Sequence, residues 1–309
     1  MKKILAAACL AVLFVSFSFA LEQRYKPPSE KSYEAVLSVL PKLSRAELKL
    51  SRQIAAKPAN IKLINDIISF IQYRNLINPE IKIPPIYFVF SNENKELRYQ
   101  GGVYFSGKKI ILLNASIINA DPKYEAFNFI HFSSILAHEI KHHEDNVLKT
   151  KPVSHIESEK NAYAQSVKVL DAFLRMNEDA ADTVPIENFY NIVQYAREYI
   201  INMRKNYLLI DKAANALLKN KKKICAAFGI DGEIFNLLNF NPEIQFNAKN
   251  GGHIVIVESY ISDRLQRLRF SINTISDEVE IINTPKEINL FKKQAKNIKI
   301  ENGQIFIKK

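Results

Sequence analysis

The sequence is poor in cysteine, with only Cys9 and Cys225 among its 309 residues. Cys9 lies in an N-terminal segment that we expect to be removed, so the remaining chain would contain one cysteine and no internal disulfide. Internal repeats and long low-complexity segments are also missing. Side-chain packing, together with any metal that the chain binds, must therefore hold the fold together. We expect Cys225 to be a small buried apolar residue.

The N-terminus lacks a hydrophobic run long enough to span a membrane. Lys2 and Lys3 precede an apolar run from Ile4 to Val15, and Ser18-Phe19-Ala20 follows it as a cleavage site of small residues. The run is too short to cross a bilayer. This pattern predicts a signal peptide over residues 1–20 and export of the chain to the periplasm or the cell exterior. Retention of the segment as an uncleaved anchor is the alternative.

A basic patch interleaved with aromatic residues is absent, although the net charge is +11. The lysines are scattered, apart from the stretches Lys219–Lys223 and Lys292-Lys293. A nucleic-acid-binding surface needs basic residues gathered on one face. We therefore expect no nucleic-acid partner and mostly solvated lysines, while association with an anionic cell envelope stays open.

One stretch of the chain predicts metal chemistry, and it reads His138-Glu139-Ile140-Lys141-His142. It lies in a helical pattern that contains no glycine or proline between Lys123 and Lys151. Residues four apart on a helix share one face, so two imidazoles can hold one metal ion from the same side. Glu139 then lies where it can take a proton from a water molecule. The pattern predicts a zinc site with His138 and His142 as ligands and Glu139 as the catalytic base.

The third ligand is expected on a second helical pattern, which begins at Ser154 after the break at Lys151-Pro152. Glu157 and Glu159 compete for this role, because two residues two apart cannot both face the metal from a straight helix. Ala162 lies three residues after Glu159 on the same face, and its small side chain would let the two helices approach closely. We therefore choose Glu159, and we expect Glu157 to be solvated in the first helical turn.

This arrangement, His138-Glu139-x-x-His142 followed by Glu159-x-x-Ala162, resembles the gluzincin group of zinc metallopeptidases. The spacing is similar to that of the membrane-associated and periplasmic branches, where a Glu-x-x-Ala helix carries the last ligand. The resemblance covers about Tyr99 to Val169 and implies a zincin-like fold that hydrolyses proteins or peptides. It implies zinc on His138, His142 and Glu159, with Glu139 as general base. The chain has Tyr163 where several such families have aspartate.

The segment before the motif predicts helices followed by a small sheet. Residues 29–78 show helical periodicity, Ile86 to Phe90 reads as a buried strand, and Tyr99 to Asn114 reads as a hairpin that turns at Ser106-Gly107-Lys108. A strand just ahead of the motif is similar to the edge strand of zincin folds, along which an extended substrate pairs. A purely structural hairpin is equally open.

The segment after the motif predicts a long helix and then strands. Residues 186–223 have helical periodicity, and the chain after Gly229 becomes β-rich, with strands expected at residues 253–258, 270–275 and 279–282 and an Asn302-Gly303 hairpin. We therefore predict an α+β protein. A mainly helical zincin-like domain with a small antiparallel sheet would occupy residues 21–228, and a β-rich region residues 229–309.

Other polar residues near the motif could have structural or functional roles. We expect His131 to be a structural histidine, since it lies two turns before His138. His143 should be solvated or paired, and Asp145 either orients a ligand or is solvated. A hydrogen-bond donor could stabilise an oxyanion over the metal, and the candidates are His155, His253, Tyr163 and Tyr190. The sequence does not choose among them.

A non-enzymatic function is the alternative to the peptidase. In that case the β-rich region would bind a component of the cell envelope, and the metal site would be structural or degenerate. A structural zinc site needs a fourth protein ligand, and His155 is the one candidate at short spacing.

Overall fold

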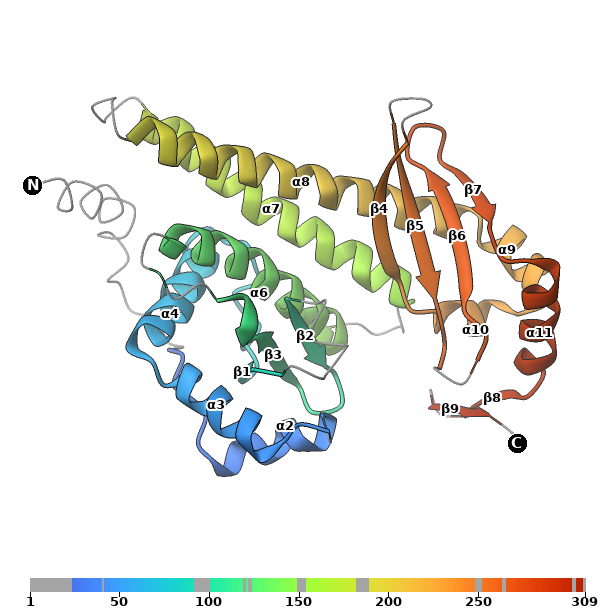
Figure 1. Cartoon of the computed structure of the whole chain (residues 1–309), viewed down its shortest axis with the longest axis horizontal. Helices are drawn as coiled ribbons and strands as arrows, with labels where there is room; N and C mark the ends of the chain where they lie inside the picture. The colour runs from blue at the N-terminus through green and yellow to red at the C-terminus, as the bar shows by residue number, and fades with distance from the viewer. Residues whose placement is uncertain are drawn as a thin grey trace, which may run out of the picture. The chain divides into compact units, whose positions relative to one another are not determined.

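A computed structural model of the chain describes residues 24–40, 42–91, 101–118, 121, 124–148, 154–181, 189–247, 252–262, 265–301 and 304–307 (Figure 1). The expected signal peptide and Cys9 lie outside these residues. The fold is α+β and mainly helical, as predicted. The chain divides into two compact units, Met1–Leu148 with Gln165–Arg204 and Lys149–Ala164 with Lys205–Lys309. Among the described helices, none combines the length and the apolar character that a membrane crossing requires.

The first unit begins with the helices predicted for residues 29–78. A 3₁₀ turn, η1 (Lys31–Tyr33), leads into α2 (Glu34–Val39), α3 (Arg45–Ala55) and α4 (Pro58–Tyr73). A capping box starts α3, in which the Ser44 hydroxyl accepts from the Glu47 amide and the Glu47 carboxylate accepts from the Ser44 amide. Pro58 starts α4, at a position where its missing N–H costs no helical bond.

A three-stranded sheet follows, with β1 (Ile86–Val89), β2 (Gly102–Phe105) and β3 (Ile110–Asn114) in the order β1-β3-β2. The predicted hairpin is confirmed, because β2 and β3 pair antiparallel with Phe105 opposite Ile110. The sheet is mixed rather than purely antiparallel, since β1 pairs parallel with β3. All five residues of β3 are buried, as expected for a central strand covered on both faces. The 3₁₀ turn η2 (Ala115–Ile117) leaves the sheet.

Three aromatic rings join the helices of the first unit. The ring of Phe70, on α4, stacks on that of Phe173 with centroids 4.5 Å apart. Phe129 lies edge-on to both, at 5.8 Å from Phe70 and 5.6 Å from Phe173. Phe129 belongs to α6 (Glu125–Leu148) and Phe173 to α7 (His155–Ala181). These contacts fix α6 and α7 against α4.

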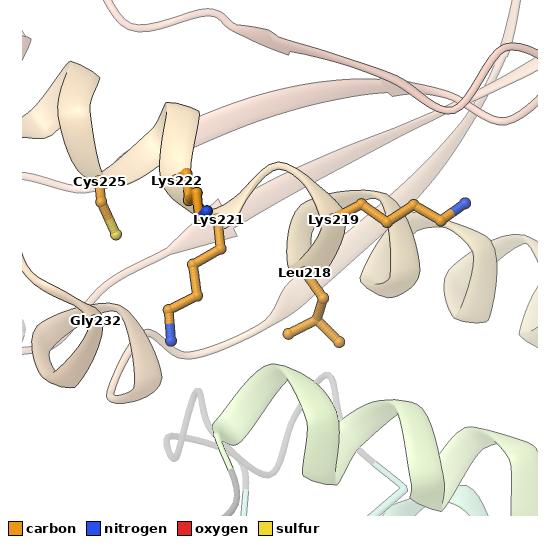
Figure 2. A pocket seen from close by; sticks show the side chains of 6 residues that line it. All are labelled: Leu218, Lys219, Lys221, Lys222, Cys225 and Gly232. Atoms are coloured by element: carbon orange, nitrogen blue, oxygen red, sulfur yellow. The ribbon is translucent and has the colours of Figure 1, made fainter.

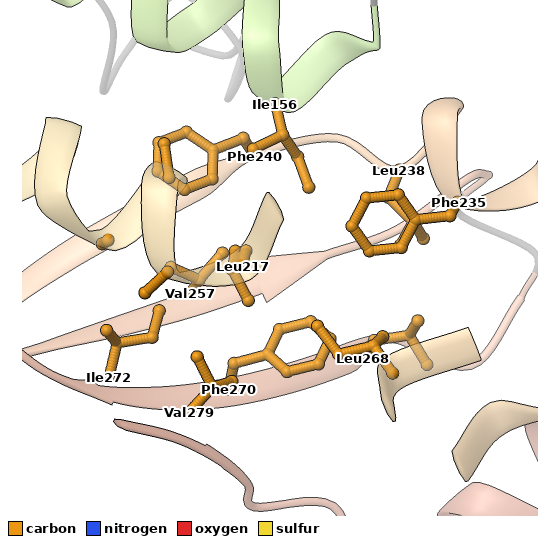
Figure 3. Close-up of a cluster of buried hydrophobic side chains, with 14 of the residues drawn as sticks. Ile156, Leu217, Phe235, Leu238, Phe240, Val257, Leu268, Phe270, Ile272 and Val279 are labelled. Atoms are coloured by element: carbon orange, nitrogen blue, oxygen red, sulfur yellow. The ribbon is translucent and has the colours of Figure 1, made fainter. Parts of the chain in front are cut away.

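The second unit contains the end of α8 (Phe189–Lys219) and a four-stranded antiparallel sheet in the order β4-β5-β6-β7. Buried residues alternate along β6, so one face of the sheet covers a core. In that core Phe228 lies edge-on to Phe270 and Phe291. Leu217, Val257 and Phe270 belong to the same cluster (Figure 3). The elements are α9 (Lys221–Phe228), α10 (Gly232–Asn236), β4 (Asn241–Asn247), β5 (Gly252–Ser259), β6 (Leu268–Asn273), β7 (Glu278–Ile281), α11 (Pro285–Ala295), β8 (Ile298–Glu301) and β9 (Gln304–Ile307).

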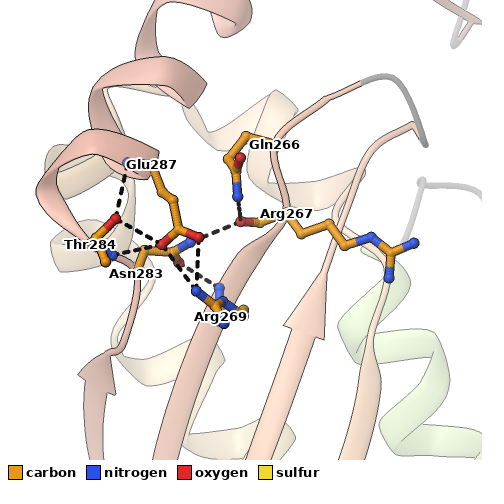
Figure 4. A network of polar contacts seen from close by, with 6 residues as sticks. All are labelled: Gln266, Arg267, Arg269, Asn283, Thr284 and Glu287. Atoms are coloured by element: carbon orange, nitrogen blue, oxygen red, sulfur yellow. Dashed lines mark hydrogen bonds and ion pairs between the residues drawn. The ribbon is translucent and has the colours of Figure 1, made fainter.

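Hydrogen bonds and an ion pair hold α11 against the sheet (Figure 4). The Glu287 carboxylate accepts from the Thr284 amide at 2.7 Å and from the Arg269 guanidinium of β6 at 2.9 Å. The bond from the Thr284 backbone, with those from the Thr284 and Arg269 side chains, lowers the pKa of Glu287. Asn283 adds two more bonds, to the Arg269 amide and the Arg267 carbonyl. One carboxylate therefore caps the helix and fastens it to the neighbouring strand.

Replacement of Phe70 by alanine tests the aromatic core of the first unit. Phe70 is 1% exposed, so Phe70→Ala should lower the free energy of unfolding by about 3–5 kcal/mol. Tyr73→Ala, in the same helix but at a side chain 68% exposed, should change it by about 0.5 kcal/mol or less. Urea denaturation followed by circular dichroism measures both, and equal losses would contradict this assignment of the core.

Candidate metal centre

The two histidines of the motif converge on one point beside α6. Their Nε2 atoms lie 3.1 Å apart, with ring centroids at 4.8 Å and planes at 77°. Two nitrogen ligands on a tetrahedral zinc ion, each at about 2.0–2.1 Å, would lie about 3.3 Å apart. The observed separation is close to that value, so His138 and His142 suit a single ion.

Glu159 of α7 completes the group. One ligand atom from each of His138, His142 and Glu159 lies within 4.8 Å of the other two, and all three residues are half-buried. No other cluster of three or more such ligands occurs among the described residues. The structure therefore brings together the three predicted ligands, and two imidazoles with a carboxylate are a donor set able to hold a metal ion.

The packing of α7 against α6 explains why Glu159 reaches the histidines. The Ser166 hydroxyl of α7 donates to the Ser134 carbonyl of α6 at 3.0 Å. His138 and His142 lie one and two turns after Ser134, while Glu159 lies about two turns before Ser166. Because the helices run in opposite directions, moving forward along α6 from Ser134 and backward along α7 from Ser166 leads to neighbouring positions on the two helices. Glu159 thus arrives opposite the histidines by helix geometry alone.

Two neighbours of Glu159 on α7 behave as predicted. Ala162 is fully buried, so a small side chain occupies the helix face next to the ligand. Glu157 is exposed in the first turn, where its amide donates to the Ser154 hydroxyl. Of the two competing glutamates, Glu157 is therefore exposed to solvent, and Glu159 is the one that lies with the histidines.

Glu139 lies in a narrow space between α6 and β2. Its side chain is only 5% exposed. A Cβ atom added to Gly102 would lie 3.2 Å from Glu139 Cγ and 2.8 Å from Ile135 Cγ2. A Cβ at Gly101 would also collide with Ile135. Only glycine lets the strand approach this closely, so Gly101-Gly102 sets the distance between the strand and the expected catalytic base.

His143, the residue that follows His142, is paired rather than solvated. It is 7% exposed, and its Nδ1 atom lies 3.0 Å from the Tyr104 hydroxyl of β2. Asn146 donates to the same hydroxyl at 3.1 Å. Burial lowers the pKa of His143, against a hydrogen bond with the Lys82 backbone, and burial raises the pKa of Tyr104. A neutral imidazole and a protonated phenol are therefore the forms that meet here.

Two other acidic residues of the motif helix, Glu144 and Asp145, form an ion-pair network with Lys141. The Lys141 ammonium lies 3.1 Å from the Asp145 carboxylate and 3.2 Å from the Glu144 carboxylate. Burial alone would lower the pKa of Lys141, but the hydrogen bonds and charges of Asp145 and Glu144 outweigh it and raise the pKa. Asp145 is 8% exposed and hence not a solvated surface residue.

The remaining polar candidates have other surroundings. His131 Nδ1 lies 2.8 Å from the Tyr199 hydroxyl, and burial lowers its pKa, as suits the structural role predicted for it. None of the candidate oxyanion donors belongs to the metal group: His155 is exposed, the His253 ring lies 5.6 Å from that of Phe246, the Tyr163 ring lies 5.3 Å from that of Tyr207, and the Tyr190 side chain lies outside the described part.

The second unit has a hollow of about 710 Å³ around the start of α9 (Figure 2). Its lining residues are Leu218, Lys219, Lys221, Lys222, Cys225 and Gly232, and none of the metal ligands is among them. Cys225 is half-buried, and burial raises its pKa, so the thiol stays protonated and poorly nucleophilic. This hollow offers no chemistry to the metal centre.

Comparison with protein-family models, with curated proteins and with solved structures finds no match to this chain.

Removal of one ligand tests the metal site. His142→Ala or Glu159→Gln leaves two ligands, so metal retained after gel filtration should fall from about one ion per chain to near zero. Two control variants keep the ligands, namely Glu157→Gln on α7 and His253→Ala on β5, and both should retain the ion. Elemental analysis for zinc, iron, manganese and nickel measures content and identity together. Full metal content in His142→Ala would exclude the site.

Replacement of Gly102 tests the close approach of β2. Gly102→Ala places a methyl group against Ile135 and Glu139 and should lower the free energy of unfolding by about 1–3 kcal/mol. Gly107→Ala is the matched control in the adjoining turn, since nothing lies within 4 Å of its added Cβ. Chemical denaturation of the two variants should differ by that amount, and equal stability would contradict the contact.

Proposed function

We propose that this chain is an exported zinc-dependent metallopeptidase of the gluzincin type. The observation that carries the proposal is the convergence of His138 and His142 with Glu159, from two helices, beside a buried Glu139. The sequence order and spacing of these four residues match those that the gluzincin resemblance implies. Proteins or peptides are the proposed substrates.

Zinc is the proposed ion because of the donor set. Two imidazole nitrogens and one carboxylate are three ligands, the number that catalytic zinc sites use, whereas structural sites use four. The group found among the described residues has three members. Zinc held there would supply Lewis acidity, which polarises a carbonyl group and lowers the pKa of water.

Glu139 is the proposed proton carrier. It follows His138 directly on α6, it is 5% exposed, and its Cγ lies close to Gly102 of β2. In the reaction, the oxygen of a water molecule bonds to the carbonyl carbon of the scissile amide while the Glu139 carboxylate takes its proton. The C–N bond then breaks, and Glu139 delivers that proton to the departing nitrogen.

Strand β2 is the proposed place where a peptide would lie. One edge of β2 pairs with β3, and its other edge has no strand neighbour among the described residues. An extended peptide could add to this edge through backbone hydrogen bonds. Gly102 of β2 adjoins Glu139, so a peptide on the edge would pass close to the proposed base.

The predicted signal peptide over residues 1–20 supports export, and the proposed localisation is the periplasm or the cell exterior. Nucleic acid is not a proposed partner. The net charge of +11 leaves room for electrostatic association with an anionic envelope.

Substitution of the base tests the mechanism. Glu139→Gln keeps the shape of the side chain but cannot take a proton, so kcat/KM for a fluorogenic peptide library should fall about 10²–10⁴-fold while metal content stays at the wild-type level. Glu125→Gln, at an exposed position of the same helix, should leave both values unchanged. A chelator should abolish activity, and added zinc should restore it.

The same experiment decides between the peptidase and a non-catalytic envelope-binding protein. A chain that keeps its metal yet hydrolyses no peptide, with or without Glu139, would favour the binding protein. Activity that persists in Glu139→Gln would remove Glu139 from the mechanism.

A further inference from the structure

The Tyr104 hydroxyl of strand β2 forms hydrogen bonds with two side chains of α6. His143 Nδ1 lies 3.0 Å from the Tyr104 hydroxyl, and Asn146 Nδ2 donates to the same oxygen at 3.1 Å. His143 and Asn146 are three residues apart and therefore share a face of the helix. The Tyr104 and His143 rings also meet edge-on, with centroids 5.3 Å apart. The hydroxyl is thus held by two polar side chains of one helical turn.

No other side chain of β2 can take this role. Side chains alternate between the two faces of a strand, and Val103 and Phe105 pack against the apolar cluster on the opposite face of the sheet. Gly102 shares the α6 face with Tyr104 but carries no side chain. Of the four residues of β2, Tyr104 alone offers a side chain to α6.

The contacts of Gly102 and Tyr104 fix the register of the strand on the helix. Residues two apart on a strand are separated by about 6.6 Å, and the four residues from Glu139 to His143 rise about 6 Å along the helix axis. The two spacings match, so Gly102 lies at Glu139 while Tyr104 lies at His143. A slip of one residue would turn the Val103 side chain toward Glu139.

We propose that Tyr104 is a positioning residue for the metal centre. Its hydroxyl holds β2 in the register that keeps Gly102 against the side chain of Glu139, the residue that follows His138. The catalytic consequence rests on the proposed peptidase function, whereas the structural consequence does not. Tyr104 acts through the strand and through Glu139, not on the reacting atoms.

The test compares Tyr104→Phe with Tyr33→Phe in the full-length chain loaded with zinc. Both changes remove one hydroxyl from the same unit, and Tyr33 donates to the Phe88 carbonyl of β1 at 3.3 Å, in the same sheet. Tyr104→Phe keeps the ring and loses both bonds. Amide hydrogen exchange over residues 101–105 should become about tenfold faster or more in Tyr104→Phe and stay unchanged in Tyr33→Phe.

Kinetics on a fluorogenic peptide supply the second readout. Tyr104→Phe should lose about tenfold in kcat with little change in KM, because the base is misplaced while metal content is kept. Asn146→Ala combined with Tyr104→Phe should add little to Tyr104→Phe alone, since both act through one hydroxyl. Tyr33→Phe should keep the wild-type kcat.

Three outcomes would overturn the proposal. Wild-type exchange in Tyr104→Phe would remove the attachment of β2. Faster exchange with an unchanged kcat would remove its role at the metal centre, and equal kcat losses in Tyr104→Phe and Tyr33→Phe would indicate a general loss of stability. If the wild-type chain itself hydrolyses no peptide, the peptidase function fails, and the exchange measurement alone decides whether Tyr104 positions the strand.

Discussion

The contact between α6 and α7 is the constraint on which the metal group depends. Ser134 and Ser166 are both buried, and the Ser166 hydroxyl bonds the Ser134 carbonyl. In a regular helix that carbonyl also accepts a hydrogen bond from the amide of His138, the first member of the metal group. A carbonyl oxygen can accept two bonds. The second helix is therefore fastened to the same backbone group that fixes the first ligand, so the positions of the two imidazoles and the carboxylate depend on one junction.

Around this junction, α6 meets a different neighbour on each side. The α7 side supplies the carboxylate ligand, and the β2 side supplies a strand close enough to confine Glu139. The contact with α7 determines which atoms can hold an ion. The contact with β2 determines the surroundings of Glu139. The second unit has a core of its own, built on Phe228, Phe270 and Phe291, and contributes its own cap and ion pairs around Glu287.

The local patterns of the sequence predicted most elements, because each pattern reports a face that must be buried. The helices before residue 78, strands β1, β5, β6 and β7 and both hairpins follow from such periodicity. Strand β4 and helix α11 were not predicted. In β4, Pro242, Ile244 and Phe246 alternate with polar residues, but the proline argues against a strand. Helix α11 begins with the Thr284 cap and Pro285, a short helical signal between two predicted strands.

The facing pair of His138 and His142 could be predicted because helical spacing is a local property, and His138, Glu139 and His142 lie within two turns. Tyr104 could not, because its partners are 39 and 42 residues away and nothing local indicates which hydroxyl will find which helix face. Gly101-Gly102 was visible as a pair of small residues. Its meaning, a close approach to Ile135 and Glu139, depends on the packing of a strand on a distant helix.

The connection between α6 and α7 has a consequence for how the protein folds. Six residues separate Leu148 from His155, so the two helices form a hairpin with a short connection. Loop closure over so few residues costs little entropy, and such a hairpin can assemble before the sheet, whose β1–β3 pairing joins segments more than twenty residues apart. An ion held by His138, His142 and Glu159 would bind this hairpin and not its separated halves, and so would favour the early pairing of the two helices as the chain folds.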